Sequence, residues 1–161
     1  MKTKSLVLSF AVLAAFSLST IAYADAPAVK GKDADHHHEK KVAGPNGGRV
    51  LTKIDPHAEF FVTPARKVQI TFLGEDGKAI APTGQTVTMI AGERTSPAKF
   101  TFAQEGNVLV SSAALPAGDG FPAILQFKTT PDAKPVTEKL VVDLSVCSGC
   151  SLAEYACICG H

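Results

Sequence analysis

The sequence predicts an all-β fold: an immunoglobulin-like antiparallel β-sandwich with a short cysteine-rich C-terminal tail and a flexible histidine-containing N-terminus. Between residues 44 and 146, short β-branched or alternating runs recur at intervals of about 8–12 residues, separated by turn-forming residues. No segment before Ser148 has a helical period. All four cysteines lie outside this series, in the tail formed by residues 147–161.

Residues 1–24 have the three parts of a secretory signal peptide. Lys2 and Lys4 form a basic start, an apolar run follows, and the small-residue segment AYA precedes the expected cleavage before Asp25. The apolar run is shorter than the roughly 20 residues that a membrane-spanning helix needs, although an uncleaved anchor is the alternative. We therefore expect a periplasmic or secreted protein that does not span the membrane after cleavage, with a single domain in residues 25–161.

Residues 25–43 are polar and have no strand or helix period, which predicts a flexible segment. His36, His37 and His38 lie in this segment among acidic residues. Neutral imidazoles beside carboxylates bind divalent zinc, nickel or copper, so the three histidines are candidate ligands of a weak metal site. The alternative is a solvated segment whose histidines bind nothing.

Eight runs in residues 44–146, the predicted sandwich domain, have the composition of strands. Val68, Ile70 and Phe72 alternate with polar residues, which is typical of a strand that buries one face. GEDGK between two runs predicts a hairpin, because glycine and aspartate tolerate left-handed backbone angles. The sequence has no tryptophan and no cysteine pair in this region, so only the architecture of an immunoglobulin domain is implied. The runs are RVLTKI, AEFFVT, KVQITFL, QTVTMIA, AKFTFA, NVLVSSA, AILQFKT and EKLVVDLSV.

His57 and Glu59 lie two residues apart at the start of one predicted strand, so their side chains share a face. A metal or acid–base role is conceivable for such a pair. No partner residues are identifiable in the sequence, and we expect an exposed pair without a function.

The tail has the pattern of a metal site. Thiolates with an imidazole favour zinc or monovalent copper, because polarizable sulfur suits borderline and soft cations. The segment between the two cysteine pairs is long enough for about a turn and a half of helix, which would fold the two halves together. The candidate ligands are spaced as Cys147-x2-Cys150-x6-Cys157-x-Cys159-x-His161.

Two other states of these sulfurs remain open. Cysteines of exported proteins usually form disulfides, and four cysteines allow three pairings between which sequence does not choose. A bridge between Cys157 and Cys159 is disfavoured, because a one-residue loop strains disulfide geometry. CSGC also resembles a thioredoxin active site locally, but we expect no strand after it to complete the βαβ unit of that fold.

The charge balance excludes an electrostatic footprint for nucleic acid. The sequence has 16 Lys and Arg against 15 Asp and Glu, and removal of Lys2 and Lys4 with the signal peptide leaves a net charge of −1. There is also no serine–histidine–aspartate arrangement, no H-E-x-x-H and no glycine-rich loop that opens a helix. We therefore expect a protein that is not an enzyme.

GPNGGRV, the run HAEFFVT and VQITFLGEDGKAI resemble a small β-rich domain found in periplasmic adaptor subunits of heavy-metal efflux pumps. In that metal-associated N-terminal domain, a histidine-rich stretch precedes a Gly-Pro-Asn/His-Gly-Gly-Arg start. The resemblance covers roughly residues 36–130 and implies a free-standing version of the domain. The cysteine-rich tail departs from the adaptor pattern. The alternative explanation of this motif is structural: Gly47 and Gly48 simply form a turn into the first strand.

Together these observations predict an exported metal-binding protein that buffers or delivers a transition metal ion, zinc or copper. The partner is expected to be a metal efflux component or another envelope protein. The alternative is an interaction module, an immunoglobulin-like domain with a disulfide-stapled tail.

Overall fold

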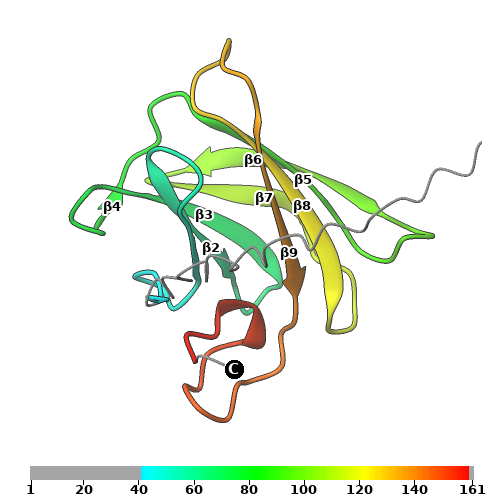
Figure 1. The fold of residues 1–161 in the computed structure, drawn as a ribbon. Helices are drawn as coiled ribbons and strands as arrows, with labels where there is room; N and C mark the ends of the chain where they lie inside the picture. Colours follow the sequence, from blue (N-terminus) through cyan, green and yellow to red (C-terminus); the bar gives the residue numbers. More distant parts are fainter. Residues whose placement is uncertain (1–40, 160–161) are drawn as a thin grey trace, which may run out of the picture. The chain divides into compact units, whose positions relative to one another are not determined.

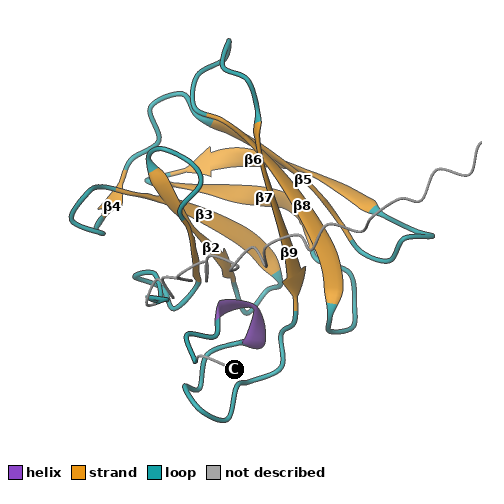
Figure 2. Cartoon of the chain, in the orientation of Figure 1, coloured by secondary structure: helices purple, strands orange, loops and turns teal. Residues whose placement is uncertain are grey.

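The strands form one continuous antiparallel sheet (Figures 1 and 2). The computed structural model describes residues 41–159, which lie within one compact unit. The strands are β1 (Arg49–Leu51), β2 (His57–Val62), β3 (Lys67–Leu73), β4 (Ala79–Ile80), β5 (Thr86–Ala91), β6 (Ala98–Glu105), β7 (Val108–Ala114), β8 (Phe121–Lys128) and β9 (Val136–Val142), followed by the 3-10 turn η1 (Glu154–Ala156).

The strand order is β1-β2-β3-β7-β6-β5-β8-β9, and the two-residue strand β4 pairs with β3. Strand β6 joins the two halves of the sheet, because its first half pairs with β5 and its second half with β7. The change of partner falls between Thr101, which faces Thr88, and Phe102, which faces Ser111. The sheet is therefore nearly closed as a barrel, with β1 and β9 at its free edges.

The all-β prediction is confirmed, and each of the eight predicted runs overlaps one strand, whereas β4 lies outside all of them. The turn at GEDGK is also confirmed, since Gly77 has a φ of 73° and its N–H donates to the carbonyl of Gly74 at 2.9 Å. It joins β3 to the short strand β4 and not to the next predicted run, which forms β5. The immunoglobulin-like arrangement of two separate sheets is not confirmed. The prediction missed the single sheet because β6 is shared between both halves, and the sharing of a strand is not visible in the local sequence.

The core lies between the inner faces of the curved sheet. Strands β5 and β8 bury every second residue, so the alternating patterns there correspond to one face in the core and one in solvent. A Leu or Phe that is fully buried in this way contributes about 2–3 kcal/mol relative to exposure. The largest fully buried apolar side chains are Phe60, Ile70, Phe72, Met89, Phe100, Leu125 and Phe127.

A buried carboxylate organises the turn that precedes β1. Glu59 of β2 is fully buried and accepts hydrogen bonds from the backbone N–H groups of Asn46 and Gly48, at 2.9 and 2.7 Å. Its second oxygen accepts from Nδ2 of Asn46 at 2.7 Å. A Cβ at Gly44 would overlap the Glu59 side chain, and one at Gly48 would overlap the carbonyl of Phe60. The GPNGGR motif therefore fits closely around one carboxylate. The expectation that Glu59 forms an exposed pair with His57 is wrong for Glu59.

The two free edges of the sheet approach each other, and the C-terminal segment packs where they meet. Lys53, just after β1, forms an ion pair of 3.2 Å with Glu138 of β9. Tyr155 of η1 is buried, and its hydroxyl oxygen accepts a hydrogen bond of 2.9 Å from the N–H of Val62 in β2. Its ring meets that of Phe60 edge-on, with centroids 5.4 Å apart. The segment that carries the cysteines is thus anchored to the core.

Residues 41–159 include no helix that could span a membrane. The predicted signal peptide, residues 1–24, and the three consecutive histidines lie outside the described residues. The predictions made for them remain predictions.

We predict that Glu59→Ala lowers the free energy of unfolding by about 3 kcal/mol, because it leaves three hydrogen-bond donors without their acceptor. Urea denaturation followed by circular dichroism measures this change. Glu75→Ala removes an exposed carboxylate and serves as the control, with an expected change within about 0.5 kcal/mol. Equal stability of the two variants would show that Glu59 does not hold the turn.

Candidate metal centre

The first two cysteines lie in a tight loop that follows β9. The N–H of Cys147 donates to the carbonyl of Leu152 at 2.7 Å, and that of Ser151 donates to the carbonyl of Cys147 at 2.9 Å. Val146 and Ala153 form an isolated antiparallel bridge at the base of the loop. These bonds close a six-residue turn that presents Cys147 and Cys150 on the same side.

The 3-10 turn η1 then reverses the chain so that Cys157 and Cys159 return to this loop. Two backbone bonds hold the turn: the N–H of Glu154 donates to the carbonyl of Ser145 at 2.8 Å, and that of Tyr155 to the carbonyl of Asp143 at 3.0 Å. The sequence predicted a helical connection between the cysteine pairs. The structure has a single short turn there, which is sufficient because Tyr155 is anchored in the core.

The four sulfur atoms form a cluster of the size that one metal ion requires. All four Sγ atoms lie within 4.8 Å of one another. The Sγ–Sγ distances are 3.3 Å for Cys147–Cys157, 4.0 Å for Cys147–Cys159 and 3.8 Å for Cys150–Cys157. Zinc bonds of about 2.3 Å in a tetrahedron give sulfur–sulfur edges of about 3.8 Å, whereas a disulfide bond is about 2.05 Å long. The cysteines are thiols in the structure, at the spacing of tetrahedral metal ligands.

Gly149 allows the two halves of the cluster to approach. A Cβ at this position would lie 2.9 Å from Sγ of Cys159 and 3.9 Å from Sγ of Cys147. The sulfur atoms fill this space, so a larger residue between the first two cysteines would displace a sulfur.

The thiols differ in their ease of ionisation. Hydrogen bonds from the backbone N–H groups of Ile158 and Leu152 stabilise the Cys150 thiolate and lower its pKa to about 7. Contacts with the Cys150 and Cys157 thiols, together with desolvation, raise the pKa of Cys159 to about 12. Desolvation, followed by a contact with Cys147, also raises the pKa of Cys157. One sulfur therefore ionises near neutral pH, and at least two keep their protons until a cation displaces them.

Of the other candidate residues, the structure describes only His57 and Glu59, and neither belongs to the sulfur cluster. His36, His37, His38 and His161 lie outside the described residues, so their role as ligands remains a prediction. His57 is exposed at the start of β2, and Glu59 is committed to the turn before β1.

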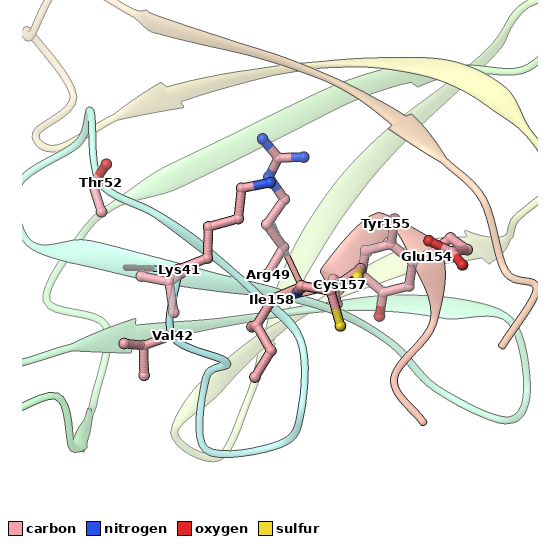
Figure 3. A pocket seen from close by; sticks show the side chains of 11 residues that line it. Lys41, Val42, Arg49, Thr52, Glu154, Tyr155, Cys157 and Ile158 are labelled. Atoms are coloured by element: carbon pink, nitrogen blue, oxygen red, sulfur yellow. Dashed lines mark hydrogen bonds between the residues drawn. The ribbon is translucent and has the colours of Figure 1, made fainter. Parts of the chain in front are cut away.

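A groove of about 420 Å³ opens beside the cluster (Figure 3). One wall consists of η1 with Cys157, Ile158 and Cys159, and the other of Lys41, Val42, Arg49, Val50 and Thr52. The antiparallel bridge between Ala43 and Arg49 holds the two segments of the second wall side by side. An occupant of the groove would contact two of the four cysteine residues, Cys157 and Cys159.

The spacing of the cysteines identifies four candidate ligands, but the local sequence does not reveal the residues that position them. Tyr155 stands between the cysteine pairs without a periodic pattern, and Gly149 looks like an ordinary turn glycine. One feature of the sequence indicates that Glu59 is buried: it lies between apolar residues in a strand. A charged residue in that setting is buried only with partners, and the partners lie 11 to 13 residues away in GPNGGR.

Comparison with protein-family models, curated proteins and solved structures finds no match for this chain. The resemblance to adaptor subunits of metal efflux pumps accordingly remains a prediction.

We predict that Cys150 is the first thiol to react in the reduced, metal-free protein. With its pKa near 7, it carries far more thiolate at neutral pH than an ordinary thiol, which gives alkylation on the order of tenfold faster. The rate rises as the pH increases through about 7 and then levels off. Iodoacetamide labelling followed by peptide mass mapping measures it.

Cys150→Ser is the control for this labelling experiment, because it removes the fast phase and leaves the slower thiols. Faster labelling of Cys159 than of Cys150 at pH 7 would contradict the hydrogen-bond pattern around the cluster.

We predict that Gly149→Ala weakens metal binding about tenfold while the fold is retained, because the added methyl group displaces Sγ of Cys159. Ser148→Ala changes an exposed neighbour in the same loop and serves as the matched control. Competition with a chromophoric zinc chelator measures both affinities. Unchanged affinity in Gly149→Ala would mean that Cys159 is not a ligand.

Proposed function

We propose that this protein binds one divalent transition metal ion, zinc above all, through Cys147, Cys150, Cys157 and Cys159. The observation that carries the proposal is the convergence of four Sγ atoms at distances that suit a tetrahedral ion. Four thiolates in a tetrahedron are a common ligand set of zinc in proteins. Copper in its monovalent state also binds thiolates and is the second candidate ion.

The proposed role is to buffer or deliver the ion rather than only to hold it. Cys147 is buried, but Cys150, Cys157 and Cys159 are each partly exposed. A partner's ligands can therefore reach three of the four sulfurs and replace them one at a time. The predicted signal peptide supports export, and the resemblance to adaptor domains supports an efflux component as the acceptor. His36, His37, His38 and His161 are proposed as further ligands that assist loading or release.

A structural role for the ion is the second candidate function, and one observation favours it. The cluster continues directly from η1, which is anchored to the core through Tyr155. An ion held there would also fix the segment that packs between the edges of the sheet. A structural site keeps its metal, whereas a delivering site exchanges it.

The test is a titration of zinc into the reduced full chain. We expect one tightly bound equivalent, and at least a hundredfold loss of affinity for Cys157→Ser, since a neutral hydroxyl replaces a thiolate. Ser151→Ala, an exposed position in the same loop, is the control. Transfer of bound zinc to a chelating acceptor within minutes supports delivery. Retention over many hours supports the structural role, and the absence of tight binding rejects both.

A further inference from the structure

The groove beside the cluster has the composition of a site for a small anion. Lys41 and Arg49 line it, and Figure 3 shows both side chains extending in the same direction from its wall. The lining contains one acid, Glu154, whose side chain lies at the other end of the groove, beyond Tyr155. The volume of the groove, about 420 Å³, is within the range of small-molecule sites.

Neither base is neutralised by an acid in residues 41–159. The ion pairs there join Lys53 to Glu138, Arg66 to Asp119 and Lys78 to Asp76, all outside the groove. Two cationic groups in one concave wall favour a ligand with carboxylate oxygens. Each cationic group can donate a charge-assisted hydrogen bond to such an oxygen. Ile158 and Val42, both exposed, add apolar surface for the carbon skeleton of such a ligand.

We propose that the groove receives the metal as its complex with a small polycarboxylate and holds the carrier while the ion moves to the cysteines. This inference rests on the proposed function, and it names the form in which the metal arrives. Cys157 and Cys159 line the same groove, so a carrier bound to Lys41 and Arg49 would bring its metal into the groove that these two cysteines border.

The transfer is a ligand exchange without oxidation or reduction. The metal–oxygen bonds of the carrier break as four metal–sulfur bonds form, and each thiol that binds releases its proton to solvent. The carrier leaves as a free polycarboxylate anion. A divalent ion with four thiolates has a charge of −2, so the product centre repels the anion that delivered it. The groove therefore holds the carrier before transfer and favours its departure afterwards.

The test compares two metal sources in stopped-flow loading, with cobalt(II) as the spectroscopic substitute for zinc. Cobalt bound to four thiolates has strong absorption, so its appearance reports transfer to the cysteines. The reduced full chain is mixed at low salt either with cobalt–citrate, an anionic complex, or with the aqua ion. The variant Lys41→Gln/Arg49→Gln is compared with the control Lys99→Gln/Lys134→Gln, which removes two exposed charges outside the groove.

We expect the groove variant to load about tenfold more slowly from cobalt–citrate and no more slowly from the aqua ion. The control loads at the rate of the unchanged protein from both sources. Equal loading of the groove variant and the control from citrate would overturn the proposal. Equal slowing from both sources would also overturn it, since it would mean that the two bases only shape the metal site.

Two further measurements separate the ways in which the proposal can fail. Metal affinity at equilibrium is expected to be the same in the groove variant and in the unchanged protein, which shows that the cysteine site is intact. Citrate added to the metal-free protein should shift the backbone amide resonances of Val42 and Arg49, and their insensitivity would exclude carrier binding. Failure of the unchanged protein to bind cobalt at all would instead reject the metal site itself.

Discussion

The contact of Tyr155 with the sheet is the interaction on which the sulfur cluster depends. Its hydroxyl satisfies the N–H of Val62, and its ring lies edge-on to Phe60 in the core. An aromatic side chain buried in this way contributes about 2–3 kcal/mol, enough to fix a short segment that has little regular structure of its own. Because this residue stands between the two cysteine pairs, its position determines that the chain turns back and that four sulfurs meet.

The carboxylate of Glu59 acts on the other wall of the site. It holds the turn of GPNGGR through three hydrogen bonds, and this turn leads into the bridge between Ala43 and Arg49. A Cβ at Gly47 would lie 3.3 Å from the Leu152 side chain, so the turn also borders the cysteine loop. The motif most visible in the sequence thus has a structural explanation, and it supports both the groove and the loop that presents the first two sulfurs.

The strands could be predicted because their signals are local: alternation in β5 and β8, and β-branched runs elsewhere. Closure of the sheet could not, since it depends on Phe102 and its successors changing partner from β5 to β7. The same division applies to the site. Spacing identifies Cys147, Cys150, Cys157 and Cys159 as candidate ligands, but whether they converge depends on tertiary contacts of Tyr155 and on the missing side chain of Gly149.

We propose that the folded chain holds four thiolates around a single ion. X-ray absorption spectroscopy at the zinc edge of the zinc-loaded full chain can test this arrangement, because it counts the atoms bound to the metal. We expect four sulfur neighbours at about 2.3 Å and no nitrogen or oxygen atom bound to the metal. A shell of nitrogen and oxygen with two or fewer sulfurs would contradict it, and would mean that the cysteines do not act together.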